Sequence, residues 1–311
     1  MENGIYFNLS EDYYFAENRL SSSGIREILS SPAEYWFNSN YNPLREERKS
    51  ESMQDGKMYH AYVLENKDFN SRYKIVPEEI SNMNKNSYQY KMWAALQNLP
   101  LVSYKKFKEM ERIYNYLNLD GQIFDSNILK DGYSEVSIFW EYRGVKIKSR
   151  IDYLKLKQFL DLKTFVRSSS EDLDIYVAKY FYTRKVYIQI ILYLMAIEYA
   201  RQFNPRQVFG NTDQLDFFLQ WRDYGNDMPL ILFLNRKLPQ FRLKTFNKEQ
   251  CPDLYRLGKS QIDKAIDIYK QYQEKNGMNY AWLEDVNLEK LSFVDEDFPQ
   301  KFYDILGVED E

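Results

Sequence analysis

The 311-residue sequence contains one cysteine, Cys251, and one histidine, His60. A single cysteine excludes a disulfide within the chain, and it excludes a zinc site or iron–sulfur cluster built from cysteine ligands. This cysteine usage fits a reducing compartment, so we expect a cytoplasmic protein.

The sequence also lacks an apolar run long enough to span a membrane. Its most apolar segment, VYIQIILYLMAIEYA, is shorter than the about 20 residues that a membrane-spanning helix needs, and it carries Gln189 and Glu198. This segment is typical of a buried helix. The N-terminus, MENGIYFNLSEDYYF, shows no basic region followed by an apolar stretch, so it does not resemble a signal peptide. We therefore expect no membrane partner.

The charge is unevenly distributed. The chain has a net charge of −4, but residues 284–311 carry ten acidic and two basic side chains, which leaves a net charge of +4 on residues 1–283. Seven Lys and Arg residues and only two Asp residues lie between Tyr142 and Lys163. A local basic strip attracts phosphates even in an acidic chain, because salt screens charges beyond about 10 Å. The alternative interpretation of this basic strip is a solvent-exposed face of a sheet with no ligand.

Two patterns divide the chain. Spacing in residues 1–130 is mainly helical, with caps at Ser21–Ser23 and a break at Pro32, whereas alternation begins at Tyr133. The expected helices lie on both sides of Pro32 and at 56–65, 81–96, 104–117, 174–202 and 252–273, with a polar loop at 42–56. The expected strands are 134–142, 145–154, 158–164, 213–223, 229–237 and 241–246, with turns at Arg143-Gly144 and 155–157.

This order predicts an α/β (α+β) core with an N-terminal helical region. We expect a single domain over residues 1–283, with a mainly helical part at 1–130 and the sheet and its helices at 131–283. Residues 284–311 form an acidic C-terminal tail.

The segment SRIDYLKLKQFLDLKT contains two acidic residues that a hairpin brings together. Side chains alternate between the faces of a strand, so Lys146, Lys148, Arg150 and Asp152 share one face. Val145, Ile147, Ile151 and Tyr153 share the other. In the next strand, Asp161 and Lys163 share a face opposite Leu160 and Leu162.

If these strands pair, Asp152 and Asp161 converge beside Lys163. With the carbonyl of Leu162 they form an all-oxygen site that suits Mg²⁺, for which Mn²⁺ can substitute. Such an ion activates water and stabilises a phosphodiester during cleavage, and Lys163 orients the water or neutralises charge. An ordinary charged hairpin is the alternative.

Three further motifs surround this hairpin. GKMYHAYVLE reads as G-x-x-x-H-x-x-x-L-E and contains His60, KSRIDYLKLKQFLDLKT reads as R-x-D followed by D-x-K-T, and QIILY reads as Q-x-x-x-Y. Together with LSSSGIREILSSPAEYW, they resemble the RecB-like branch of the PD-(D/E)xK nuclease superfamily. In particular they resemble the RecE-type exonuclease domain of phages and prophages, from about Tyr6 to Trp282. The acidic residue of the E-x-K form is an aspartate here, Asp161.

The resemblance implies a restriction-endonuclease-like core, in which helices flank a mixed central sheet. It also implies Mg²⁺-dependent degradation of the 5′ strand at linear duplex ends, which leaves 3′ tails for recombination. It implies that His60, Asp152 and Asp161 bind metal and that Lys163 assists the water. It implies a ring-shaped homo-oligomer, such as a tetramer, a strand-annealing partner protein, and the cytoplasm of a bacterial or phage-infected cell.

The resemblance also implies DNA contacts by Gln189 and Tyr193, which lie one helical turn apart. Arg150 would hold a phosphate, with Lys148 in the same basic strip. Glu135 lies where related nucleases place an acid. The alternatives are a structural His60, a core hydrogen-bonding Gln189, a solvated Glu135, and an Arg150 paired with a carboxylate.

Two other functions stay open on the sequence. A related nuclease could act on single-stranded or flapped DNA, and a catalytically silent protein could bind DNA ends. Digestion of blunt, single-stranded and circular DNA separates the first from a duplex exonuclease. Titration with Mn²⁺ separates the second, because a binding module has no need of metal ligands.

Overall fold

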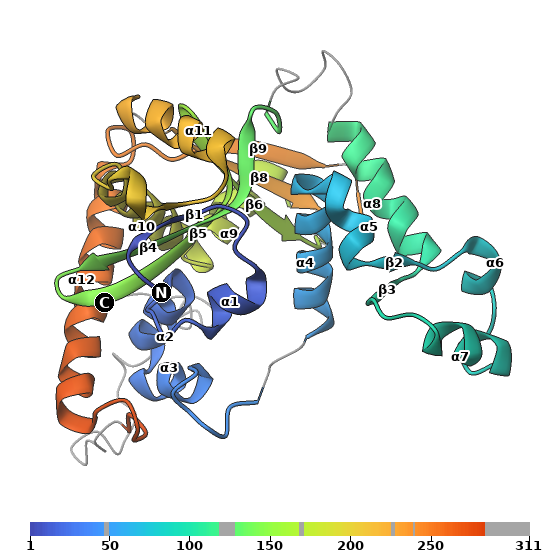
Figure 1. Cartoon of the computed structure of the whole chain (residues 1–311), viewed down its shortest axis with the longest axis horizontal. Helices are drawn as coiled ribbons and strands as arrows, with labels where there is room; N and C mark the ends of the chain where they lie inside the picture. The colour runs from blue at the N-terminus through green and yellow to red at the C-terminus, as the bar shows by residue number, and fades with distance from the viewer. Residues whose placement is uncertain (47–49, 118–127, 168–170, 225–227, 239, 284–311) are drawn as a thin grey trace, which may run out of the picture.

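The structure is a computed structural model of the chain, and it describes residues 1–46, 50–117, 128–167, 171–224, 228–238 and 240–283. Within these ranges the helices pack around one large sheet (Figure 1). Among the helices described, none is both long and apolar enough to cross a membrane. The expected acidic tail at 284–311 lies outside the described residues.

The central sheet is mixed, as expected, and its seven strands run in the order β7-β1-β4-β5-β6-β8-β9. β1 with β7 and β6 with β8 pair parallel, and the other neighbours pair antiparallel. The strands are β1 (Gly4–Tyr6), β4 (Gly132–Tyr142), β5 (Val145–Lys155), β6 (Gln158–Phe165), β7 (Val208–Phe209), β8 (Met228–Asn235) and β9 (Phe241–Thr245). A separate pair joins β2 (Lys74–Ile75) to β3 (Leu101–Val102).

Helices cover both faces of this sheet. They are α1 (Glu11–Ala16), α2 (Ser22–Ser30), α3 (Pro32–Asn38), α4 (Glu51–Leu64), α5 (Phe69–Arg72), α6 (Glu78–Ser81), α7 (Tyr88–Ala95), α8 (Tyr104–Leu117), α9 (Leu173–Thr183), α10 (Val186–Ala200), α11 (Thr212–Asp223) and α12 (Pro252–Asn276), with short 3₁₀ helices η1 (Asn66–Asp68) and η2 (Pro205–Gln207). α2, α3 and α9 to α12 pack in a first core cluster, and α4, α5 and α8 pack in a second. Alternate residues of β8 enter the two clusters, so these lie on opposite faces of the sheet.

The hairpins that carry the predicted site are confirmed. β4, β5 and β6 match the three expected strands to within a few residues. Arg143 and Gly144 both have positive φ, 50° and 79°, which is the backbone geometry of a two-residue hairpin turn. Ser21 caps α2, and Pro32 is the first residue of α3, as the break at this position predicts.

Two expected elements are wrong. The helix at 174–202 is two helices, α9 and α10, because Lys185 adopts a left-handed conformation with φ 50° that a right-handed helix cannot contain. The expected strand at 213–223 is helix α11. Asn211 and Gln214 form a capping box that starts this helix, so its buried Phe218 and Trp221 lie one turn apart rather than on a strand.

Smaller differences concern the boundaries. α4 begins within the expected loop at 42–56, because the side chain of Ser50 caps its first turn. The expected helix at 81–96 is reduced to the last residue of α6 and to α7. Four of the described strands were not expected: β1 and β7, which extend the sheet beyond β4, and β2 and β3, which form the separate pair.

Candidate functional site

The last turns of α4 place the imidazole of His60 beside the sheet. Tyr59, Ala61 and Tyr62 are buried in the second core cluster and hold the helix against β5, β6 and β8. The hydroxyl of Tyr59 also donates to the carbonyl of Arg236, 2.9 Å away. His60 therefore presents a partly exposed side chain from a helix that is anchored on both sides of it.

The β4–β5 hairpin supplies two carboxylates at one level. Ser134 pairs with Tyr153 and Val136 pairs with Ile151, so Glu135 and Asp152 lie opposite each other. Glu135 has φ 53°, a left-handed conformation that is uncommon for a residue with a side chain. The strand faces switch here: Ile151 packs in the first cluster, whereas Tyr153 packs in the second. Tyr153 therefore does not share the face of Ile151, in contrast to the alternation expected for β5.

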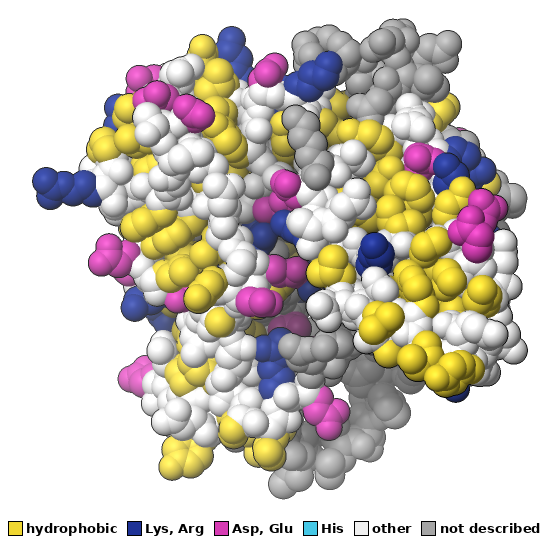
Figure 2. All heavy atoms as spheres, turned by 45° about the vertical axis from the view of Figure 1, so that its right-hand side comes forward, with side chains coloured by type: hydrophobic (Ala, Val, Ile, Leu, Met, Phe, Trp, Pro, Cys, Tyr) yellow, Lys and Arg dark blue, Asp and Glu magenta, His cyan; other side chains and the backbone are white. Residues whose placement is uncertain are grey.

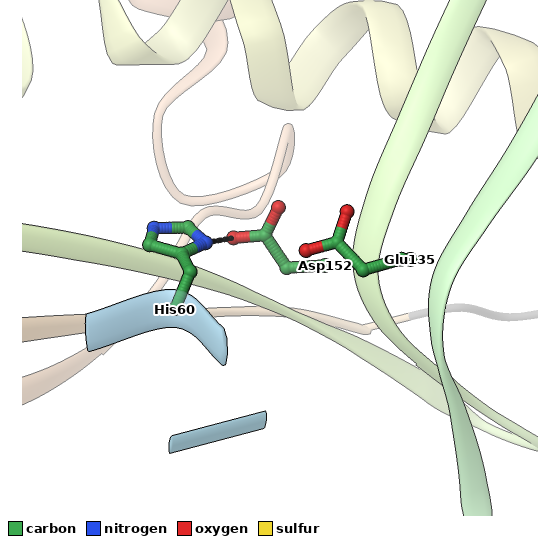
Figure 3. A group of neighbouring side chains, drawn as sticks. All are labelled: His60, Glu135 and Asp152. Carbon is green, nitrogen blue, oxygen red and sulfur yellow. Dashed lines mark ion pairs between the residues drawn. The ribbon is translucent and has the colours of Figure 1, made fainter. Parts of the chain in front are cut away.

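His60, Glu135 and Asp152 form a compact donor group. Each offers one ligand atom, and these atoms lie within 4.8 Å of one another. The Nδ1 atom of His60 is 3.6 Å from Oδ2 of Asp152 (Figure 3). The carboxylates of Asp152 and Glu135 point to the same side of the hairpin, toward the imidazole. An imidazole and two carboxylates are suitable ligands for a divalent cation.

β5 and β6 part next to this group, at a point that we call the fork. Their pairing ends at Tyr153 and Leu160, so Asp152 and Asp161 are the first unpaired residues beyond it. The fork is bridged by a side chain instead, because Oδ2 of Asp152 accepts a hydrogen bond of 2.7 Å from the amide of Leu162. The backbone of Leu162 also interacts with His60 in a way that favours the charged imidazole. The Leu162 carbonyl stays a predicted ligand.

Asp161 lies outside the three-residue donor group and has partners of its own. Its side chain is fully buried, and the Nζ atom of Lys163 lies 2.8 Å from Oδ1 and 2.7 Å from Oδ2. Gln189 donates to Oδ1 of Asp161 over 3.1 Å and lies 2.6 Å from the hydroxyl of Tyr193. The two predicted residues of α10 are thus connected to the hairpin acid.

Burial and repulsion disfavour the charge on Asp152. Burial raises the pKa of the Asp152 carboxyl well above its usual range, the charge on Asp161 raises it further, and Lys163 opposes both. Burial also lowers the pKa of His60 below its usual value. A neutral imidazole can bind a metal, and a cation would relieve the repulsion between the acids.

Arg150 and Lys148 differ in whether their side chains still have a hydrogen-bond donor for a ligand. Arg150 pairs with Glu135, but its buried Nη1 atom has no hydrogen-bond partner among the residues that the structure describes. Lys148 is buried, and its Nζ atom donates to the carbonyls of Tyr14 and Glu17 over 2.9 and 2.8 Å. Burial lowers the pKa of Lys148 to about 8. Arg150 therefore retains a free donor, whereas Lys148 holds the N-terminal segment.

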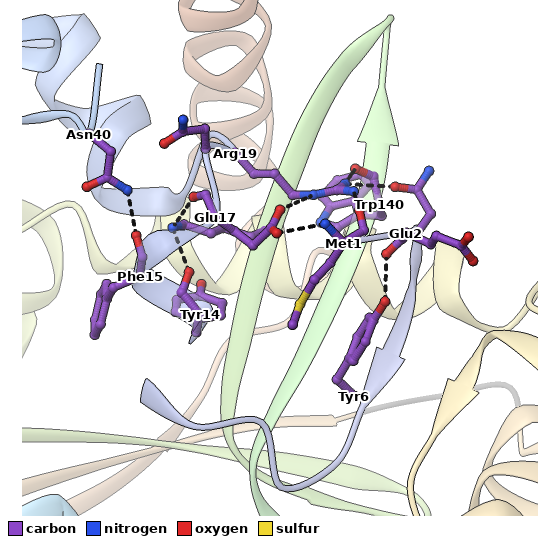
Figure 4. Close-up of polar contacts among 12 residues, drawn as sticks. Met1, Glu2, Tyr6, Tyr14, Phe15, Glu17, Arg19, Asn40 and Trp140 are labelled. Atoms are coloured by element: carbon purple, nitrogen blue, oxygen red, sulfur yellow. Dashed lines mark hydrogen bonds and ion pairs between the residues drawn. The ribbon is translucent and has the colours of Figure 1, made fainter. Parts of the chain in front are cut away.

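The N-terminal segment is fixed beside the site by a polar network (Figure 4). Arg19 donates to the carbonyls of Met1 and Trp140, and Asn40 donates to the carbonyl of Phe15 over 2.7 Å. Within this segment the ring of Tyr14 lies under the guanidinium of Arg150, 5.4 Å from its Cζ atom. No local pattern indicates this contact, because it depends on tertiary packing between positions far apart in the chain.

Glu65, the last residue of the G-x-x-x-H-x-x-x-L-E motif, connects α4 to the hairpin. It pairs with Arg72 at 2.7 Å and accepts a hydrogen bond of 3.2 Å from the hydroxyl of Ser134, the neighbour of Glu135. Burial raises the pKa of Glu65. Its contacts place it behind the donor group, where it supports the strand.

A cleft of about 1130 Å³ opens onto these residues. In Figure 2 a hollow runs between two parts of the surface, with acidic and basic side chains along it. The cleft is lined by predicted site residues from both faces of the sheet: His60, Glu135, Lys148, Arg150, Asp152, Gln189 and Tyr193. Helices on opposite faces reach one cleft because the strands part at the fork.

Comparisons with known proteins agree with this arrangement. A family model described as "PDDEXK-like domain of unknown function (DUF3799)" matches residues 21–210. No curated protein matches the chain. One similar solved structure, from Eubacterium rectale, carries the name "Putative exonuclease"; it is 15% identical, with 85% of this chain and 88% of that chain covered and a TM-score of 0.47. A similarity at that score carries no argument about the site.

Proposed function

Because this chain belongs to the family of PDDEXK-like domains of unknown function (DUF3799), we propose that it is a metal-dependent nuclease that degrades DNA from linear duplex ends. The observation that carries the proposal is the donor group at the cleft, where ligand atoms of His60, Glu135 and Asp152 lie within 4.8 Å of one another. Beside it, Lys163 supplies the amine of a D-x-K motif.

The residues present fit a divalent cation. Arg150 pairs with Glu135, whereas Asp152 accepts a backbone hydrogen bond and faces two other acids, and the Asp161 carboxylate already holds the Lys163 ammonium through both oxygens. Two carboxylates held this close resist ionisation together unless a cation binds between them. His60, Glu135 and Asp152 would hold the ion, and Asp161 with the Leu162 carbonyl would complete its oxygen ligands.

A divalent cation bound there supplies positive charge that acidifies water and stabilises the phosphodiester during cleavage. The chain's own residues perform the remaining tasks. Lys163, fixed by Asp161, donates to the water or to the phosphate at the fork. Gln189 keeps Asp161 in place, and the free Nη1 atom of Arg150 donates to a neighbouring phosphate oxygen.

The finer features of the proposal rest on the resemblance to RecE-type exonucleases. They are Mg²⁺ as the natural cofactor, removal of the 5′ strand, contacts of Gln189 and Tyr193 with DNA near the cleaved phosphate, a ring such as a tetramer, and cooperation with a strand-annealing protein. Mass photometry of the purified chain tests the ring. Digestion of duplexes labelled at the 5′ or the 3′ end tests the polarity.

Digestion of linear duplex in Mg²⁺ or Mn²⁺ tests the function itself. We expect the wild type to degrade it, and we expect Asp161→Ala and Lys163→Ala to lose at least about 100-fold in rate, as expected for loss of general acid–base or electrostatic assistance. A matched control is Asp174→Ala, an exposed acid paired with Arg242 and Lys244 away from the cleft. Wild-type rates in both site variants would refute the assignment.

The same assay decides between the alternatives. Digestion of single-stranded or flapped DNA in preference to blunt duplex would identify the related nuclease, and rapid cutting of closed circles would exclude an exonuclease. Binding of DNA ends without cleavage by the wild type would identify the silent binder.

A further inference from the structure

The mouth of the cleft is bridged by one lysine. Lys57 of α4 forms an ion pair with Glu11 of α1, and its Nζ atom lies 5.3 Å from the centre of the Phe15 ring. All three residues line the cleft, and the side chains of Lys57 and Glu11 are about half exposed. A pair this exposed is weak, so another anion can displace Glu11 from the ammonium.

Phe15 is an exposed aromatic face inside this positive environment. It is 49% exposed, and the ammonium groups of Lys57 and Lys148 lie 5.3 and 5.9 Å from its ring centre. Its ring points away from the polar contacts that fix its backbone (Figure 4). Phe37 has the same exposure but does not line the cleft. The ring of Tyr14 meets that of Phe15 edge-on, with 5.4 Å between the ring centres. Positive charge beside an exposed aromatic ring is the combination that binds unpaired nucleic acid strands.

This pair lies next to the donor group. Lys57 precedes His60 by one helical turn, about 4.5 Å along the axis of α4, which is comparable to the about 3.4 Å rise per nucleotide of a strand. Phe15 is connected to the donor group through its neighbour Tyr14. The ring of Tyr14 lies under the guanidinium of Arg150, and Arg150 pairs with Glu135. A strand that reaches the donor group therefore passes between Phe15 and Lys57.

We propose that Phe15 and Lys57 form a subsite for one unpaired nucleotide, and that Glu11 holds the ammonium of Lys57 until a phosphate replaces it. The base would stack on Phe15, and the phosphate would pair with Lys57. A base inside a duplex has both faces covered by its neighbours, so the subsite selects the unpaired strand. This inference rests on the proposed function, because it assigns the strand that the nuclease site receives.

Gly56 supports the proposal that the cleft receives a nucleic acid strand. It lies within α4 and lines the cleft next to Lys57. A Cβ atom added to it would come no closer than 3.8 Å to the nearest atom, Oγ1 of Thr164, which is an ordinary contact. Packing in the protein alone does not require glycine, although glycine destabilises a helix interior. Its lack of a side chain leaves room for the backbone of a bound strand.

The test measures binding of a labelled single-stranded oligonucleotide and of a labelled blunt duplex by fluorescence anisotropy. The Asp152→Asn protein serves as background, because it prevents cleavage and removes a charge that repels phosphate. We expect Phe15→Ala to weaken single-strand binding by about 5- to 100-fold. Phe15→Trp should retain it, and Phe15→Leu should not restore it. Phe37→Ala is the matched control and should bind as the background does.

The ion pair is tested by the salt dependence of the same binding. Lys57→Gln should weaken single-strand binding and reduce the slope of log K against log salt by about 0.7, the value for one phosphate contact on a single strand. Glu11→Gln should strengthen binding by about two- to fivefold, because it removes the competing anion. Lys179→Gln, from the exposed pair of Lys179 with Glu171 outside the cleft, should change neither quantity.

Unchanged single-strand affinity in Phe15→Ala or in Lys57→Gln overturns the proposal. An equal loss of duplex affinity in Phe15→Ala also overturns it, because the subsite would then not select unpaired bases. Hydrolysis of bis(4-nitrophenyl) phosphate by the wild type with Mn²⁺ reports on the metal centre alone. Hydrolysis without the binding effects refutes the subsite but not the nuclease, and binding effects without hydrolysis refute the nuclease but not the subsite.

Discussion

Asp152 and Asp161 stand opposite each other across the fork, yet their surroundings differ. Asp161 is fully buried and has two cationic or amide partners, Lys163 and Gln189. Asp152 accepts one backbone hydrogen bond, from Leu162, and faces the acids Glu135 and Asp161. The first carboxylate is neutralised by the fold, and the second is left for a ligand to neutralise. In the proposed nuclease site, Asp161 would position the amine of Lys163, and Asp152 would be a principal ligand of the ion.

Removing each charge should therefore change the stability of the metal-free protein in opposite directions. Asp161→Asn leaves the partly buried Lys163 beside an uncharged partner, and we expect a loss of up to about 3–5 kcal/mol in the free energy of unfolding. Asp152→Asn removes a charge that burial and Asp161 disfavour, and we expect a gain. Urea unfolding in EDTA measures both. The same sign for both variants would show that the two acids share one environment.

Cation binding should stabilise the folded protein only where Asp152 keeps its carboxylate. An ion that binds only the folded protein stabilises it by about 2.7 kcal/mol at a concentration 100-fold above its dissociation constant. We expect Mn²⁺ to raise the melting temperature of the wild type and to have little effect on Asp152→Asn. Asp174→Asn, which alters an exposed acid away from the cleft, should respond as the wild type does. An equal shift in Asp152→Asn would place the ion elsewhere.

The smallest expected effect is a dependence on pH. The pKa of Asp152 is raised in the folded protein by burial and by Asp161, so the folded state keeps this proton where the unfolded chain has lost it. Stability from this group is therefore present below the ordinary carboxyl pKa of about 4, and it falls as pH rises from there through the raised value. In EDTA, the melting temperature of Asp152→Asn minus that of the wild type should increase from pH 4 to pH 7. A constant difference would mean that Asp152 titrates normally.

The parts of the site that follow from local pattern could be predicted from the sequence. Alternation placed Asp152 and Asp161 on the strands of one hairpin, and the short turn expected at 155–157 set their approximate level. The Arg143-Gly144 turn set the level of Asp152 against Glu135. Helical spacing placed Gln189 and Tyr193 on one face, and both line the cleft. These features depend on neighbours within a few residues, so the sequence contains the information that sets them.

The remaining features depend on contacts between distant segments. Strict alternation puts Ile151 and Tyr153 on one face, but the left-handed backbone of Glu135 across the hairpin accompanies a switch of face. Basic charge made Lys148 a candidate for phosphate, but the carbonyls of the N-terminal segment surround its ammonium. The helix break at Lys185 has no proline or glycine to mark it.

The fork also bears on which ions the site can discriminate. No ladder bond between β5 and β6 sets the separation of Asp152 from Asp161, since their pairing ends one residue earlier. The two strands can therefore move apart or together without loss of ladder hydrogen bonds, and the hydrogen bond from the Leu162 amide to the Asp152 side chain is the contact that such a movement would stretch. A fork that can open and close in this way would accommodate the about 2.0–2.1 Å bonds of Mg²⁺ as well as the about 2.3–2.6 Å bonds of Ca²⁺. Calcium should thus compete for the ligands, and selectivity must arise in the chemical step rather than in the radius of the cation.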